Sequence, residues 1–440
     1  MSLLIEGGHP LVGTVKISGA KNSVLKIIAA SLFSNEDIII DNVPKIGTVM
    51  TDIEVAESVG AVVDWVGNNR ILINGSKIST YEIPDEIGSR QRTALLLVGP
   101  LLFRFGKAKI PKFKHAGYKA GPLNRHVEMW RSLGIEVVEN DKYFELSSEN
   151  IKPANINFKT TSHMGTDNAI ISSLFIPGET VITNASEESE VDDLINFINL
   201  MGGSVQRTEP RTVKVTGSTI FKSCRFEIQS DKSEAATFAA AAVLTKGNIE
   251  IKGVDRTVFI PFANFLNRIG ARFEFIENGI KVWRNEPELS AIQLNISPTP
   301  GFIPDWQSLA VLILTQAQGE SFVNDTVYTN RFSYVTDLNR MGAEIELVKP
   351  SSLNLFPVIS DDSYDFEKNG EPDCVAKIKG PSKLKGEKLQ ILDFRYGAVL
   401  PLAALSAEGK SEIIGMENIE EYFENFSVKL EGLGAKIWTQ

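Results

Sequence analysis

The stretch from Lys107 to His126, KAKIPKFKHAGYKAGPLNRH, concentrates cationic side chains in a chain whose formal net charge is −10. It holds five lysines, one arginine and two of the chain's four histidines, and it has no cysteine, aspartate or glutamate. Lysines gathered in a glycine-containing loop favour a small anion such as phosphate, because each supplies a point charge. Histidine is the side chain here whose ordinary pKa suits proton transfer at neutral pH. The composition of residues 107–126 therefore predicts that they form an anion-binding loop.

Length and composition limit what kind of protein surrounds this loop. A chain of 440 residues is too long for one ordinary core, so we expect two or three domains. Its 43% hydrophobic and 23% charged residues are typical of soluble globular proteins. There is no apolar run of 18 residues, and the start MSLLIEGGHP lacks the form of a signal peptide, so we expect a cytoplasmic protein. The acidic balance argues against nucleic acid and anionic membranes as partners.

Metal and disulfide chemistry have little support in the sequence. The two cysteines, Cys224 and Cys374, are too few for a disulfide framework or a metal cluster. The four histidines are scattered, and no carboxylate cluster has the spacing of metal ligands. We therefore expect neither a metal ion nor a cofactor.

The elements that must position the loop are repetitive. A segment of helical period, a turn centred on glycine and a short strand recur six times. A left-handed glycine at the end of a helix lets the chain reverse into a strand. The turns read SVGAVV, SLGIEV, LMGGSV, RIGARF, RMGAEI and GLGAKI, and their glycines are Gly60, Gly134, Gly202, Gly270, Gly342 and Gly434.

A second motif recurs with the first: a strand, a polar loop and a helix that is apolar almost all round. Examples are VKISGAKNSVLKIIAASLF, FEIQSDKSEAATFAAAAVL, LNISPTPGFIPDWQSLAVLIL and LQILDFRYGAVLPLAALSAEG. Helices of this kind are buried rather than laid on a surface. The pattern predicts an α/β protein of six βαβαββ-type repeats, three per domain; an ordinary α/β protein with recurrent glycine turns is the alternative.

The segments SGAKN, LVGPLLFRFG, GTDN, IPDWQ, TVYTNRF and RMGAE together resemble the enolpyruvyl transferase family over essentially the whole chain. The similarity is strongest to the branch that acts on UDP-N-acetylglucosamine. The resemblance implies two inside-out α/β barrels with substrates bound between them. One discontinuous domain would comprise residues 1–20 and 231–440, and the other residues 21–230, with 107–126 as a mobile lid.

The resemblance also implies a reaction. A carboxyvinyl group would pass from phosphoenolpyruvate to a hydroxyl of UDP-N-acetylglucosamine, with release of phosphate, in peptidoglycan precursor synthesis. Such chemistry needs cations for phosphoenolpyruvate, an acid for its methylene carbon and a base near the acceptor hydroxyl. The expected partners are phosphoenolpyruvate and a nucleotide sugar, and a monomer is the default of the family.

Candidate site residues follow by matching motifs. Lys21 and Asn22, expected in a loop before the first apolar helix, match the family's phosphoenolpyruvate-binding pair. Arg331 and Arg395 match the two arginines that hold its carboxylate, for which the planar guanidinium is suited; structural ion pairs are their alternative role. Asp305 matches the carboxylate near the acceptor hydroxyl and is the candidate base, although an aspartate after proline also caps helices.

Further residues match the acceptor site or the crossing between domains. The acceptor-binding candidates are Arg92, Pro122, Ser162, His163, Asp305 and Val327. Asp231 and Glu234 fall at the crossing, and capping of the helix that begins SEAATF is their alternative role.

Five positions depart from the family pattern. Ala116 stands where the lid carries its general acid, and Gly121 and Glu421 stand where two arginines grip the phosphate. Thr160 and Asn124 replace a lysine and an aspartate of the nucleotide-sugar site. Losing two charge-assisted contacts would cost about 3–6 kcal/mol, roughly a hundredfold to ten-thousandfold in affinity.

Compensation within the lid is one answer to these departures. His115, beside Ala116, is the candidate catalytic acid, with a solvated loop histidine as its alternative role. Lys112, Lys114, Lys119 and Arg125 surround the vacated positions. Three interpretations stay open: a transferase of the UDP-N-acetylglucosamine type with an altered lid, a transferase on another nucleotide or sugar acceptor, and a non-catalytic binding paralogue.

Overall fold

The chain folds into two compact units. The computed structural model describes residues 2–113, 123–284, 288–360, 364–392 and 398–439. Unit 1 comprises Met1–Ser18 and Ser230–Gln440, and unit 2 comprises Gly19–Gln229. The boundaries expected from the sequence were after residues 20 and 230. Within unit 1, the backbone N–H of Asp231 donates to the carbonyl of Ser18, which joins the two chain crossings.

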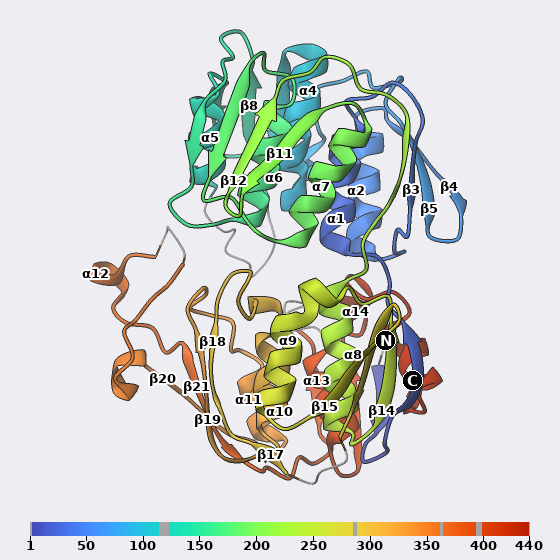
Figure 1. The fold of residues 1–440 in the computed structure, drawn as a ribbon, viewed down its shortest axis with the longest axis vertical. Helices are drawn as coiled ribbons and strands as arrows, with labels where there is room; N and C mark the ends of the chain where they lie inside the picture. Colours follow the sequence, from blue (N-terminus) through green and yellow to red (C-terminus); the bar gives the residue numbers. More distant parts are fainter. Residues whose placement is uncertain (1, 114–122, 285–287, 361–363, 393–397, 440) are drawn as a thin grey trace. The chain divides into compact units, whose positions relative to one another are not determined.

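Unit 2 contains three sheets (Figure 1). Their strand orders are β13(Cys224–Glu227)-β3(Ile38–Asp41)-β5(Arg70–Asn74)-β4(Val62–Gly67), β11(Ser204–Glu209)-β12(Thr212–Thr216)-β10(Glu179–Thr183)-β9(Asn155–Asn157) and β6(Lys107–Pro111)-β8(Tyr143–Ser147)-β7(Glu136–Glu139). In the first two, one parallel strand flanks an antiparallel trio. In the third, a single parallel bridge between Glu82 and Lys109 stands in the place of that strand. The sheet topology thus repeats within the unit.

Unit 1 repeats the same topology. Its sheets are β22(Lys388–Gln390)-β23(Lys410–Ile414)-β1(Ser2–Glu6)-β24(Lys436–Thr439), β15(Arg272–Ile276)-β16(Gly279–Trp283)-β14(Asn248–Lys252)-β2(Val12–Lys16) and β17(Leu289–Ser290)-β19(Ala317–Asp325)-β21(Val375–Gly380)-β20(Glu344–Val348), with β18(Gln293–Ile296) paired to β19. In the first of these, β1 lies antiparallel between β23 and β24. The beginning of the chain therefore completes a sheet that its last strands build.

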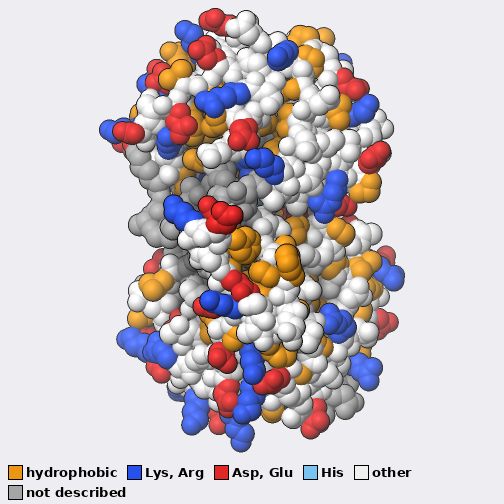
Figure 2. Space-filling model, turned by 90° about the vertical axis from the view of Figure 1, so that its left-hand side faces the viewer, with side chains coloured by type: hydrophobic (Ala, Val, Ile, Leu, Met, Phe, Trp, Pro, Cys, Tyr) orange, Lys and Arg blue, Asp and Glu red, His pale blue; other side chains and the backbone are white. Residues whose placement is uncertain are grey.

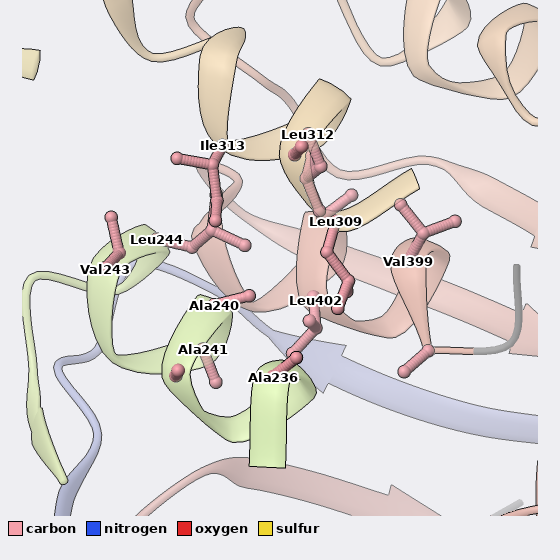
Figure 3. Close-up of a cluster of buried hydrophobic side chains, with 14 of the residues drawn as sticks. Ala236, Ala240, Ala241, Val243, Leu244, Leu309, Leu312, Ile313, Val399 and Leu402 are labelled. Carbon is pink, nitrogen blue, oxygen red and sulfur yellow. The ribbon is translucent and has the colours of Figure 1, made fainter. Parts of the chain in front are cut away.

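Buried helices fill the interior of each unit, as their apolar sequences predicted. They are α1(Lys21–Ser31), α4(Val98–Phe105) with the preceding 3-10 turn η1(Arg92–Leu97), α6(His163–Ser173), α8(Lys232–Leu244), α10(Gln307–Leu314) with η2(Pro304–Trp306), and α13(Val399–Ser406). In unit 1 the side chains of α8, α10 and α13 meet in one apolar cluster, where the alanines of α8 allow close approach (Figure 3). Asp231 caps α8, because its Oδ1 accepts from the backbone N–H groups of Ser233 and Glu234 at 2.8 and 3.1 Å. The cap predicted for this residue is confirmed.

A second set of helices ends at the six glycine turns. These helices are α2(Gly47–Ser58), α5(Asn124–Ser132), α7(Ser189–Leu200), α9(Arg256–Arg268), α11(Val335–Arg340) and α15(Phe426–Gly432). Each is followed by its glycine at positive φ, between +74° and +106°, and then by a strand. A side chain is strained in that conformation, which is why glycine recurs there. The helix–glycine–strand pattern read from the sequence is therefore confirmed at all six positions.

One connection breaks the internal symmetry. The strands β4 and β5, β11 and β12, and β15 and β16 are joined by two residues, whereas β20 and β21 are separated by residues 349–374. This excursion contains η3(Pro350–Leu353) and α12(Phe366–Asn369) and returns to the sheet at β21. The remaining short helices are α3(Asp85–Gly88) and α14(Glu417–Glu420).

On the face shown in Figure 2, basic and acidic side chains are interspersed over each unit. Among the described residues, no helix is both long enough and apolar enough to cross a membrane.

Candidate active site

Asp305 and Arg331 come together in unit 1. Nη1 of Arg331 lies 3.1 Å from Oδ1 of Asp305, and the guanidinium carbon lies 3.9 Å from the centroid of the Tyr328 ring. The Arg331 side chain is 15% exposed and that of Asp305 is 49% exposed. Burial by itself lowers the pKa of Arg331, but Tyr328, Asp305 and Asp325 outweigh it, so the pKa is raised. The guanidinium therefore stays charged although it is largely buried.

The loop that carries Val327 and Tyr328 is shaped by a buried carboxylate. Oδ1 of Asp325, at the end of β19, accepts from the backbone N–H groups of Val327 and Tyr328, both at 2.9 Å. Its Oδ2 accepts from Nε2 of Gln307 at 3.2 Å. Since Gln307 begins α10 directly after η2, this contact ties the loop of Val327 to the turn that holds Asp305. Val327 itself is buried.

The alternative roles were a helix cap for Asp305 and a structural ion pair for Arg331, and only the second is found. Asp305 lies inside η2, and α10 begins without any side-chain cap, so Asp305 does not act as a helix cap. The ion pair considered for Arg331 is present, and its partner is Asp305, another candidate site residue. The pair therefore joins two residues that were both matched to the site by family resemblance.

Lys21 and Asn22 begin α1 in unit 2, and the expectation that they lie in a loop is wrong. The chain enters the helix through Ala20, whose backbone is extended and whose N–H donates to the carbonyl of Gln229 at 2.7 Å. Ala20 has no side chain that could cap the first turn. The N-terminal N–H groups of a helix favour negative charge, and the ammonium group of Lys21 adds its own positive charge at the same place.

A buried ion pair connects α1 to α6. Nζ of Lys26 lies 2.7 Å from Oδ2 of Asp167, and both side chains are 1% exposed. Burial raises the pKa of Asp167 to about 6, while the charge of Lys26 acts to lower it. His163, the first residue of α6, places Nδ1 3.3 Å from the same Oδ2. Ser162 caps α6 by accepting from the N–H of Gly165 at 3.1 Å.

Sequence reasoning missed this pair, although a signal was present. Lys26 and Asp167 are charged residues within helices whose other residues are mostly apolar, KNSVLKIIAAS and HMGTDNAIISS. Charged residues are almost never fully buried unless paired. Two charges of opposite sign in separate buried helices therefore could have indicated a pair.

Arg92 lies against the same end of α6. Its Nε donates to Sδ of Met164 at 3.0 Å, and it opens η1. The residues on either side are fixed to α2: Gln91 Nε2 donates to the carbonyl of Thr48 at 2.9 Å, and Thr93 Oγ1 donates to Oδ1 of Asp52 at 2.7 Å. Unit 2 thus brings Arg92, Ser162 and His163 together.

Asp52, which accepts a hydrogen bond from Thr93 next to Arg92, makes the stability of the folded protein depend on pH. Burial raises the pKa of Asp52 from 3.8 to about 7, and its Oδ2 has no hydrogen-bond partner among the described residues. As pH rises between these two values, the unfolded chain loses a proton that the folded chain keeps, so stability falls. We expect Asp52→Asn to be about 1–3 kcal/mol more stable than the wild type at pH 7, with the gain vanishing near pH 4. Urea unfolding of both proteins from pH 4 to 7 measures this, and a gain independent of pH contradicts it.

The lid predicted over residues 107–126 is too long at both ends. Lys107–Pro111 forms β6, and α5 begins at Asn124. Nζ of Lys112 lies 2.7 Å from Oε1 of Glu139, so it is neutralised on the sheet rather than available to an anion. Its predicted role in compensation is therefore not supported.

His126 is also no part of a cationic loop. It is buried in α5, where its Nδ1 is 3.0 Å from Nδ2 of Asn168, and burial lowers its pKa to about 3. The imidazole is therefore neutral at physiological pH. The candidate residues His115, Ala116, Gly121, Pro122 and Arg395, with Lys114 and Lys119, lie outside the described residues.

Neither cysteine supplies a reactive thiolate. Burial raises the pKa of both Cys224 and Cys374 to about 11, so neither thiol is ionised at neutral pH. Within the described ranges, no three His, Cys, Asp or Glu side chains are grouped so that they could hold a metal ion.

Comparison with known proteins gives a consistent picture. The family model described as EPSP synthase (3-phosphoshikimate 1-carboxyvinyltransferase) matches residues 5–430. The chain is 31% identical over 436 residues to UDP-N-acetylglucosamine 1-carboxyvinyltransferase 1 of Legionella pneumophila, covering 98% of this chain and 81% of the relative. It is 33% identical to UDP-N-acetylglucosamine 1-carboxyvinyltransferase of Chlamydia muridarum over 441 residues, covering 99% and 98%.

Solved structures show the same fold. The enolpyruvyl transferase NikO from Streptomyces tendae superimposes with a TM-score of 0.85 at 21% identity, over 99% of this chain and 98% of that one. An EPSP synthase from Acinetobacter baumannii superimposes with a TM-score of 0.72 at 15% identity over all of both chains.

Proposed function

The chain belongs to the EPSP synthase (3-phosphoshikimate 1-carboxyvinyltransferase) family and is a 1-carboxyvinyltransferase, and on that premise we propose that its acceptor is UDP-N-acetylglucosamine. A carboxyvinyl group passes from phosphoenolpyruvate to an acceptor hydroxyl, and phosphate leaves. The names of the full-length relatives at 31% and 33% identity support this acceptor. The reaction is then a step of peptidoglycan precursor synthesis that needs no metal or cofactor, carried out by a cytoplasmic monomer.

The observation that carries the proposal is the pair of Asp305 and Arg331. The guanidinium is stacked on Tyr328 and held at Nη1 by Asp305, while its buried Nε has no hydrogen-bond partner in the described part of the chain. A fixed guanidinium whose remaining N–H groups can still donate is suited to a carboxylate such as that of phosphoenolpyruvate. Asp305, half exposed beside it, is placed to take the proton of an acceptor hydroxyl.

Unit 2 supplies the other proposed contacts. Lys21 and Asn22, at the uncapped start of α1, bind the phosphate of phosphoenolpyruvate. Arg92, Ser162 and His163 of unit 2 bind the nucleotide sugar, and by family resemblance Val327 of unit 1 is an acceptor-binding residue. By family resemblance, Arg395 is the second carboxylate-binding arginine, Pro122 contacts the acceptor, and His115 is the acid.

A second candidate acceptor is another nucleotide or sugar. Thr160, at the position of a lysine in the nucleotide-sugar site, and Asn124, at the position of an aspartate, change the charge of that site, and Glu421 reverses a phosphate contact. With Lys112 paired on the sheet and His126 neutral, fewer lid cations remain to offset these changes. The same facts favour the third interpretation, a paralogue that binds without reacting.

Phosphate release from phosphoenolpyruvate, measured with a panel of acceptors, separates these possibilities. We expect release that depends on UDP-N-acetylglucosamine and is absent when the acceptor is omitted. Release with UDP-glucose or a nucleoside monophosphate, but not with UDP-N-acetylglucosamine, contradicts the proposed acceptor. No release with any acceptor, together with tight binding of the nucleotide sugar by calorimetry, supports the non-catalytic interpretation.

A further inference from the structure

The excursion of residues 349–374 creates a cavity within unit 1. Leu353 and Leu355 of the excursion line it together with residues of α9, β18 and β19. The cavity measures about 730 Å³, within the range of small-molecule sites. None of the residues proposed above for substrate binding lines it.

The strand register explains which side chains face this cavity. In the parallel pair β18 and β19, Gln293 is opposite Phe322, and Asn295 is opposite Asn324. Alternate residues of a strand share a face, so these four side chains lie on one side of the sheet. All four line the cavity, together with the buried rings of Phe265 and Phe302. The site therefore combines aromatic surfaces with carboxamide groups.

The two asparagines leave a defined hydrogen-bonding edge. Nδ2 of Asn324 donates to Oδ1 of Asn295 at 3.2 Å. This bond uses one polar atom of each carboxamide and leaves the other, Oδ1 of Asn324 and Nδ2 of Asn295, outside it. In the described part of the chain neither atom has a hydrogen-bond partner. Asn324 is 7% exposed and Asn295 is exposed, so both atoms are open to a ligand that enters the cavity.

We propose that this cavity is a second small-molecule site that binds a planar, uncharged purine through a lactam edge, as in the bases hypoxanthine and guanine. The acceptor of Asn324 and the donor of Asn295 are complementary to the N–H and C=O of a lactam. Phe265, Phe302 and Phe322 supply aromatic and apolar contacts for the ring. No acidic side chain is among the described lining residues. Arg268 also lines the cavity, and its positive charge is suited to a phosphate attached to the sugar of a bound nucleotide.

Inosine and 1-methylinosine form a matched pair of probes, because the methyl group removes only the lactam donor. Calorimetry is performed with saturating UDP-N-acetylglucosamine, so that the proposed acceptor site is occupied. We expect inosine to bind the wild type and 1-methylinosine to bind about tenfold or more weakly. Asn295→Asp keeps the oxygen that accepts from Asn324 but removes the free donor, so inosine affinity falls about tenfold or more. Asn267→Asp, an exposed residue of α9 outside the cavity, leaves affinity unchanged.

Several results overturn the proposal. The first is no detectable binding of inosine at millimolar concentration. Equal binding of inosine and 1-methylinosine shows that the lactam edge is not recognised. Equal loss of affinity in Asn295→Asp and Asn267→Asp, or displacement of inosine by UDP-N-acetylglucosamine, places the ligand elsewhere on the chain.

Discussion

Replacing Arg331 with alanine is expected to lower kcat/KM for phosphoenolpyruvate by about a hundredfold to ten-thousandfold. Two charge-assisted hydrogen bonds to a carboxylate are worth about 3–6 kcal/mol together. The guanidinium is fixed between Asp305 and Tyr328, so little flexibility remains to be lost when the substrate binds. Steady-state phosphate release at varied phosphoenolpyruvate concentration measures the effect.

A matched control comes from the same unit. Arg340 in α11 is also paired with an aspartate, Asp337 at 3.1 Å, but it is half exposed, and no site residue is its partner among the described contacts. Arg340→Ala is expected to change kcat/KM less than twofold, because exposed ion pairs are worth roughly 0–1 kcal/mol. Retained activity in Arg331→Ala, with circular dichroism showing a folded protein, removes Arg331 from the site.

Removing the cation of the buried pair in unit 2 is expected to be the largest stability effect. Lys26→Met leaves Asp167 without its partner in a site that is 1% exposed, which costs about 3–5 kcal/mol at pH 7. The cost falls as pH is lowered toward 4, because the carboxyl without its cation takes up a proton in the folded protein. Adding Asp167→Asn removes the stranded charge and restores most of the loss. Urea unfolding at both pH values measures the single and double variants.

The control for this prediction is Lys109, whose Nζ lies 3.1 Å from Oε2 of Glu82 at the surface of the same unit. Lys109→Met is expected to cost at most about 1 kcal/mol, since water screens that pair. If Lys26→Met costs no more than Lys109→Met, the buried pair contributes little to stability.

What could be predicted from the sequence was mainly local. The six glycine turns were found because helix end, glycine and strand are adjacent in the chain, and the structure has all six. The buried helices were found because an apolar sequence without a polar side has one stable environment. The cap at Asp231 follows the same logic, since its partners are two and three residues away.

What could not be predicted depended on contacts between distant residues. Lys26 and Asp167 meet only after α1 and α6 have packed, and Lys112 meets Glu139 only when β6, β7 and β8 form their sheet. The start of α1 at Lys21 was missed because Ala20 carries none of the side chains that usually mark a helix start. The groups proposed for catalysis in unit 1 were identified by motif, but their arrangement around Tyr328 and Asp325 was not.

The placement of β1 and β2 sets an order on how the chain folds as it leaves the ribosome. These strands are made before unit 2, yet β2 pairs with β14, and β1 pairs with β23 and β24, which follow unit 2 in the chain. Unit 2 is continuous, so it can complete its core once residue 229 has emerged. The strand β2 waits until β14 has been made, and β1 waits longer, until β23 and β24 have been made. We therefore expect unit 1 to complete its folding after unit 2, with β1 as the segment that waits longest for its partners.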